Sequence, residues 1–181
     1  ELTGYDHLNP FNRQDPYQEF PFLAKGLRIN TFIKNQVLWY YSPNETSETY
    51  EIPTTIKSVA SSAFHNASLK KLSLPNNSGF SYGRNAFSDC PNLETIVFKA
   101  PPSTYGALYG SKIKKVYIDI KELNYQIQKF LENILLKRDY FPNDCEIHIN
   151  DRMRSDINRH RLIGRSKRVF PNRSYFWYNP D

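Results

Sequence analysis

Three short segments decide the fold of this chain: Leu69-Lys-Lys-Leu72-Ser-Leu74, Leu93-Glu-Thr-Ile96-Val-Phe98 and Ile113-Lys-Lys-Val116-Tyr-Ile118. In each segment, apolar residues stand at the first, fourth and sixth positions. The last two are two residues apart, so both side chains lie on one face of a β-strand, and the first fills the same core from the preceding turn. A unit of this size cannot bury its own apolar face, but several stacked units can. The spacing therefore predicts a stack of similar coils.

The surroundings of the three segments repeat as well. An alanine followed by a large apolar residue precedes each segment by six or seven residues: Ala63-Phe64, Ala86-Phe87 and Ala107-Leu108. An earlier partial copy, Tyr50-Glu-Ile52-Pro53, matches Leu72-Ser-Leu74-Pro75, and the middle apolar positions are 22, 24 and 20 residues apart. Four copies with nearly one period favour a repeat fold over an ordinary β-rich domain with coincidental spacing.

These residues resemble the BspA-type leucine-rich repeat of bacterial surface proteins. The resemblance rests on the stretch from Tyr50 to Pro75 and on Asn85-Ala-Phe-Ser-Asp-Cys-Pro-Asn-Leu93, which matches the Ala-Phe, Cys and Leu positions of that repeat. It covers about residues 32–120 and departs at His65-Asn66, which lacks the cysteine, and at Leu108, where the repeat has Phe. It implies a repeat solenoid, a short β-rich leucine-rich-repeat stack built as a right-handed α/β coil. It also implies a non-enzymatic cell-surface or secreted module for binding or adhesion.

The flanks of the repeats are interpreted as end units. Helical periodicity runs from Lys121 to Arg138 and predicts a long capping helix that starts after Asp119. The alternation in Cys145–Ile149 predicts a last strand, which makes an enlarged final coil. Three regions are expected: an extended N-terminal cap (1–31), the solenoid (32–150), and a basic aromatic C-terminal segment (151–181).

Charge is concentrated in the C-terminal segment. The chain has 181 residues and a net charge of +6, and residues 151–181 contain eight basic and three acidic side chains, which is +5 of that total. Aromatic residues follow the arginines, so two interpretations remain: the segment packs as a C-terminal cap, or it binds a polyanion such as an acidic glycan or nucleic acid. Nucleic acid is the less expected of the two. The candidate anion-binding residues are Arg161, Arg165, Lys167, Arg168 and Arg173.

The predicted strands also define a candidate recognition surface. Side chains that alternate with the buried ones would form one strip if the coils stack in order. The candidate partner-binding residues on this strip are Glu51, Lys71, Ser73, Val97, Lys115 and Tyr117, with His148 in the last strand. The partner would be a protein or a glycan, such as a host matrix or surface component. A solvated face without a special role is the alternative.

No motif for catalysis, metal binding or cofactor binding is present in the sequence. There is no phosphate-binding glycine loop, HExxH, GxSxG or CxxC pattern, so no enzyme, cofactor or metal is expected. Cys90 and Cys145 are expected to be free thiols, although an oxidising compartment would allow them to pair. The family resemblance implies an extracellular or cell-surface location, and a first residue of Glu1 fits a mature chain after signal removal. The sequence has no apolar run long enough for a membrane span.

Overall fold

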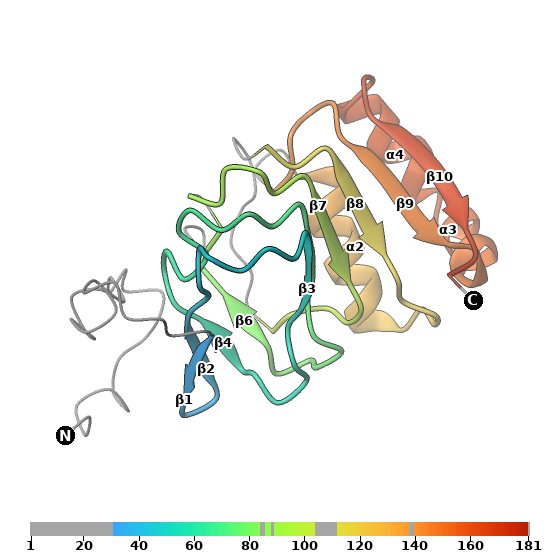
Figure 1. The fold of residues 1–181 in the computed structure, drawn as a ribbon. Helices are drawn as coiled ribbons and strands as arrows, with labels where there is room; N and C mark the ends of the chain where they lie inside the picture. The colour runs from blue at the N-terminus through green and yellow to red at the C-terminus, as the bar shows by residue number, and fades with distance from the viewer. Residues whose placement is uncertain (1–30, 84–85, 88, 104–111, 138–139, 181) are drawn as a thin grey trace.

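A computed structural model describes residues 31–83, 86–87, 89–103, 112–137 and 140–180. Most strands belong to one parallel six-stranded sheet, sheet B (Figure 1). In sequence order its strands are β3 (Thr49–Glu51), β5 (Lys71–Ser73), β7 (Thr95–Phe98), β8 (Lys115–Ile118), β9 (Glu146–Asn150) and β10 (Ser174–Tyr178). Their order in the sheet is also the order in the chain. No helix within the described ranges is long and apolar enough to cross a membrane.

A second, smaller sheet, sheet A, lies at the N-terminal end. Its strands are β1 (Phe32–Lys34), β2 (Val37–Tyr40), β4 (Ser58–Val59) and β6 (Ser81–Tyr82). The hairpin β1–β2 is antiparallel, and β2, β4 and β6 are parallel to one another. Asn35 and Gln36 turn the hairpin with φ angles of 52° and 62°, the left-handed conformation of a two-residue hairpin loop.

The chain alternates between the two sheets from β2 to β7, so each pass adds one strand to each sheet. This is a repeat, or coil, fold, and it follows from the predicted spacing. Leu72 is in register with Tyr50 and Ile96, and Ile96 is in register with Val116. All nine apolar residues of the three repeated segments are buried.

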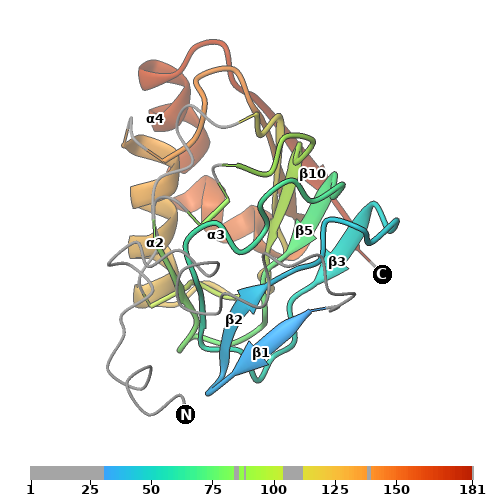
Figure 2. The same ribbon diagram turned by 60° about the vertical axis from the view of Figure 1, so that its left-hand side comes forward.

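Helices replace the strands of sheet A at the C-terminal end. Helix α2 (Tyr125–Leu136) connects β8 to β9, and η4 (Asp151–Met153), α3 (Arg154–Arg159) and α4 (Leu162–Val169) connect β9 to β10. Helices α2 and α4 pack against each other. Figure 2 shows α2, α3 and α4 on the same side of sheet B, which leaves its other face open over these strands.

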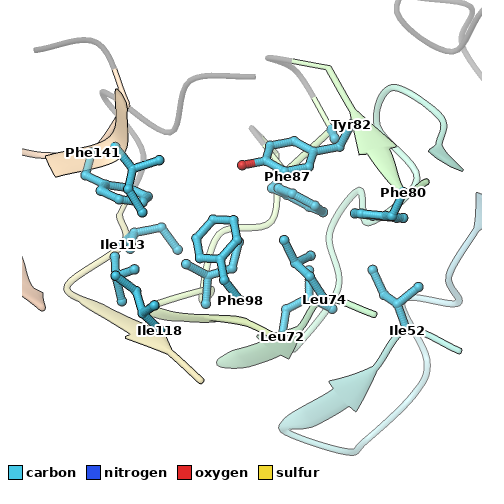
Figure 3. Close-up of a cluster of buried hydrophobic side chains, with 14 of the residues drawn as sticks. Ile52, Leu72, Leu74, Phe80, Tyr82, Phe87, Phe98, Ile113, Ile118 and Phe141 are labelled. Atoms are coloured by element: carbon cyan, nitrogen blue, oxygen red, sulfur yellow. The ribbon is translucent and has the colours of Figure 1, made fainter. Parts of the chain in front are cut away.

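One continuous hydrophobic core lies between sheet B and the elements behind it. It extends from Leu38 to Leu162 and contains aliphatic residues of sheet B and aromatic rings from the opposite side. Figure 3 shows Leu72 and Leu74 near Phe80, Phe87 and Phe98 in this core. Since the core is shared by the repeats and by the helical end, we expect the two ends to stabilise each other.

The structure does not support a long helix that caps the array. Helix α2 begins and ends inside the predicted range. It connects β8 to β9, two neighbouring strands in the interior of sheet B, so it does not cover the end of the sheet. Its N-cap is Asn124, whose Oδ1 accepts a hydrogen bond from the Ile127 amide at 2.8 Å. Asp119, the expected cap, instead accepts a hydrogen bond from the Asn150 side chain at 3.1 Å.

The basic aromatic segment is folded through residue 180 and extends sheet B. Strand β10 pairs with β9 in parallel along its whole length, with Tyr175 opposite Ile147 and Trp177 opposite Ile149. The predicted N-terminal cap lies, apart from Thr31, outside the described residues, as does the Ala107-Leu108 pair of the third repeat. The predicted boundaries of the three regions stay predictions.

Candidate functional site

The open face of sheet B carries one aligned row of side chains, here called the outer row. Strand register places one residue from each strand side by side in the order Glu51, Ser73, Val97, Tyr117, His148 and Phe176. A second row beside it contains Lys71 and Lys115, in register with Thr95 and Glu146. The strand register therefore brings all six predicted partner-binding residues onto one face.

The side chains of the outer row differ in how much of their surface is exposed to solvent. Ser73 and Val97 are each only 6% exposed, so these two predicted residues offer little surface to a partner. Glu51 is exposed, and its carboxylate pairs with the Lys99 ammonium at 3.4 Å. The N-terminal half of the row is therefore a shallow surface of small or covered side chains with one exposed ion pair.

The C-terminal half of the outer row and the neighbouring Tyr178 form an aromatic cluster, here called the aromatic stack, which is defined as Tyr117, His148, Phe176 and Tyr178. The Tyr117 and His148 rings are stacked at 4.4 Å with an interplanar angle of 12°, and His148 and Phe176 are stacked at 4.8 Å and 20°. Tyr178 meets Tyr117 edge to face at 5.3 Å. The three rings of Tyr117, His148 and Phe176 therefore stack on one another along the row, across three neighbouring strands. Phe176 remains 43% exposed at the edge strand.

Charged and polar groups surround the aromatic stack. The Lys71 ammonium lies over the Tyr117 ring at 5.6 Å. The Glu146 carboxylate is 3.3 Å from His148 Nε2 and 4.0 Å from the Lys115 ammonium. Burial raises the pKa of the Tyr178 hydroxyl, and the nearby Asp119 carboxylate and Tyr117 raise it further, so Tyr178 stays a neutral hydrogen-bonding group at physiological pH.

Phe176 and Tyr178 were not among the residues predicted for this face. They belong to β10, which lacks the apolar spacing of the repeats, so their register could not be predicted from that spacing. A usable signal was present: Phe176 and Tyr178 alternate with Tyr175 and Trp177, which is the pattern of a strand with two different faces.

The candidate anion-binding residues separate into three environments. Arg161, Arg165 and Arg168 line one surface hollow of about 600 Å³. Lys167 is exposed, with its ammonium 5.8 Å from the centre of the Tyr175 ring.

Arg173 does not fit an anion site, so this prediction is wrong for that residue. It is 3% exposed, and its guanidinium donates hydrogen bonds to the carbonyl oxygens of Leu135, Phe141 and Pro142 at 3.2–3.4 Å. It also lies 3.5 Å from the centre of the Phe170 ring. Arg173 therefore joins β10 to the chain around α2 and is unavailable to a ligand.

The two cysteines are free and buried, as predicted. Burial raises the pKa of each thiol to about 11, with Asp89 adding to the effect at Cys90. Such thiols are protonated at neutral pH and are poor nucleophiles or metal ligands. Among the described residues, no group of three or more His, Cys, Asp or Glu side chains could hold a metal ion.

Comparison with known proteins places these features in a family. The family model for the BspA type leucine rich repeat region matches residues 40–137 in six copies, which is more than half of the chain. The crystal structure of the pneumococcal vaccine antigen PcpA also matches, with 19% identity and a TM-score of 0.36 over 82% of this chain and 46% of that chain. This chain thus spans less than half of the PcpA chain. The search of curated proteins finds no match. On the family match, and with the repeated strands of sheet B in register, the chain belongs to the BspA type leucine rich repeat family.

Proposed function

We propose that the chain is a non-enzymatic binding or adhesion module of a cell-surface or secreted protein. In this proposal its repeats form a short right-handed solenoid that recognises a protein or glycan through the open face of sheet B, for example a host matrix or surface component. The family suggests a surface protein-interaction module, and family membership alone names no partner. No cofactor is required.

The aromatic stack is the observation that carries this proposal. Aromatic side chains are enriched where proteins bind partners, since they bury a large area at a small entropic cost. Here an aromatic cluster lies on the open face of a sheet, beside Lys71, Lys115 and Glu146, which can fix the orientation of a partner. We therefore expect the binding energy to be concentrated at the C-terminal half of the outer row.

The test is a binding panel of matrix glycoproteins and surface glycans with matched alanine variants. Phe176→Ala and Tyr117→Ala should each weaken binding about tenfold or more, since interface aromatics of this kind contribute about 2 kcal/mol or more. Tyr125→Ala is the control, because Tyr125 is 73% exposed but lies on α2, on the opposite side of sheet B. Equal binding by all three variants would place recognition elsewhere.

A second candidate function is polyanion binding through the basic C-terminal segment. The exposed cations of α4 and of the residue before it support this candidate: Arg161, Arg165, Lys167 and Arg168. Binding to an acidic glycan or a nucleic acid should then fall steeply with salt, with a slope set by the number of cations engaged. This second candidate would be contradicted if the chain binds the panel with an affinity that changes neither with salt concentration nor on charge reversal at Arg168.

A further inference from the structure

The hollow beside α4 lies on the helical side of the molecule, away from the outer row. Arg161, Arg165 and Arg168 form its cationic wall, and the partly buried Ile163 contributes apolar surface. Its volume of about 600 Å³ is in the range of small-ligand pockets. A hollow with one cationic wall and one apolar surface suits a ligand that has an anionic group and a less polar body.

Two of the three arginines have no carboxylate partner among the described residues. Neither Arg161 nor Arg168 forms an ion pair in the part of the chain that the structure describes, and Arg165 is 4.0 Å from Glu132. The neighbouring arginines differ, since Arg154 pairs with Asp151 at 3.4 Å and Arg159 with Asp156 at 3.0 Å. The hollow therefore carries two arginines whose charge is not paired within the described residues.

Two residues that line the hollow are unfavourable choices for the stability of their local structure. Gly164 lies inside α4, where glycine is a poor helix former, although a Cβ there would meet no atom within 4 Å. Arg161 adopts φ 54° and ψ 30°, a left-handed conformation that favours glycine. Packing does not explain the glycine, since a side chain would meet no neighbouring atom there. Both residues have an effect at the hollow: Gly164 leaves it open, and Arg161 adds a guanidinium to its wall.

We propose that this hollow binds a phosphate or sulfate ester carried on a sugar. Guanidinium groups present paired N–H donors that match the oxygens of a tetrahedral oxyanion. The space above Gly164 and the surface of Ile163 can accept the C–H face of the sugar ring, and the Asn158 side chain can bond its hydroxyls. This proposal rests on the second candidate function and narrows it from a general polyanion to one esterified residue.

The experiment is an NMR titration of the ¹⁵N-labelled full chain with glucose 6-phosphate and, separately, glucose 6-sulfate. Glucose and inorganic phosphate are the reference ligands. We expect saturable shifts at the amides of Ile163, Gly164 and Arg165 with an ester, and at least about tenfold weaker binding of either reference ligand, because each fills only half of the hollow. The relative affinities of the two esters identify which oxyanion the site prefers. Free phosphate that binds as tightly as both esters would overturn the sugar part of the proposal.

Three variants separate a binding role from a structural one. Gly164→Leu should fill the hollow, and Arg161→Gly and Arg168→Ala should remove donors, so each should weaken ester binding about tenfold or more. Arg159→Ala, which removes the same charge from a paired arginine, should change it less than twofold. The thermal midpoints of Gly164→Leu and Arg161→Gly should stay equal to or above that of the parent chain, because both substitutions remove a local conformational cost.

Unchanged ester binding by Gly164→Leu would overturn the proposal, as would equal losses in Arg159→Ala and Arg168→Ala. A parallel titration with a heparin oligosaccharide separates this failure from that of the second candidate function. If heparin binds the parent chain and Gly164→Leu equally while neither ester binds, the hollow is excluded and polyanion binding through the exposed cations remains. If heparin and both esters fail to bind the parent chain, both ideas are wrong.

Discussion

The two halves of sheet B share a core but differ in the elements that cover it and in the surface they expose. Strands β3, β5 and β7 are backed by the short strands of sheet A, and β8, β9 and β10 are backed by helices. The core-facing row is in register from Tyr50 to Tyr175 across both halves. The outer row changes from the exposed Glu51 and the buried Ser73 and Val97 to the aromatic stack. Every strand must therefore place a residue of its core-facing row in the shared core, whereas the residues of the outer row can differ from strand to strand.

The largest expected effects come from the shared core. Leu72→Ala in β5 and Ile149→Ala in β9 should each lower the free energy of unfolding by about 2–5 kcal/mol, since both side chains are fully buried. Chemical denaturation followed by far-UV circular dichroism measures both losses. A single transition in each variant would show that the halves unfold together, and two separated transitions would show that they are independent. Ile33→Ala, at an exposed position of β1, is the control with a small effect.

Arg173 tests how the helical half is joined to the sheet. Arg173→Ala should cost about 2–4 kcal/mol of unfolding free energy, because it removes charge-assisted hydrogen bonds to three carbonyl groups. Arg159→Ala, on an exposed side chain, should cost less than about 1 kcal/mol. Hydrogen exchange should show the added opening first in β10. A loss in Arg173→Ala no larger than that in Arg159→Ala would contradict this structural role.

Each half contains one buried thiol, which gives a pH-dependent comparison. The folded pKa of both Cys90 and Cys145 is about 11, above the value for an exposed thiol, so the unfolded chain releases these protons at lower pH. The native state then binds more protons, and stability should fall as the pH rises from about 9 to about 11. Replacing both cysteines by alanine should reduce this slope, as measured by unfolding at several pH values. If the double variant loses stability with pH at the same slope as the parent chain, the loss of stability comes from the tyrosines and not from the cysteines.

The smallest expected effect belongs to the exposed end of the outer row. A double-mutant cycle on Glu51 and Lys99 should give a coupling of about 0–0.5 kcal/mol, because the Glu51 side chain is 76% exposed and the pair is screened by solvent. A cycle on His148 and Phe176, whose rings stack, should give about 0.5–1.5 kcal/mol. Equal couplings would remove the energetic difference between the two halves.

Sequence reasoning succeeded where the structure depends on local periodicity. The apolar positions of the repeats predicted which residues are buried, such as Leu72, Ile96 and Val116, and their spacing predicted the strand register. The outer row as far as His148 followed from the same alternation. The helix was predicted with its boundaries displaced, since Asn124 and Asp119 are both plausible N-caps and only the geometry of the connection selects Asn124.

Sequence reasoning failed where contacts join residues with no repeated spacing. The stack of Phe176 on His148 requires a parallel pairing across 28 positions, with α3 and α4 in between. Arg173 was grouped with exposed arginines because composition cannot separate a buried guanidinium from a solvated one. Likewise, Ser73 and Val97 occupy the predicted face, but their burial depends on the neighbouring side chains.

The sequence by itself determined the repeat: its apolar period specifies the strands, their order and the buried row, because each coil must bury the same positions to continue the core. Tertiary structure decided what surface that repeat presents. Pairing of β10 with β9 completes the aromatic stack, and packing of α4 beside α3 brings Arg161, Arg165 and Arg168 around one hollow. These arrangements depend on distances between segments that carry no common period, so they follow only from the packed chain.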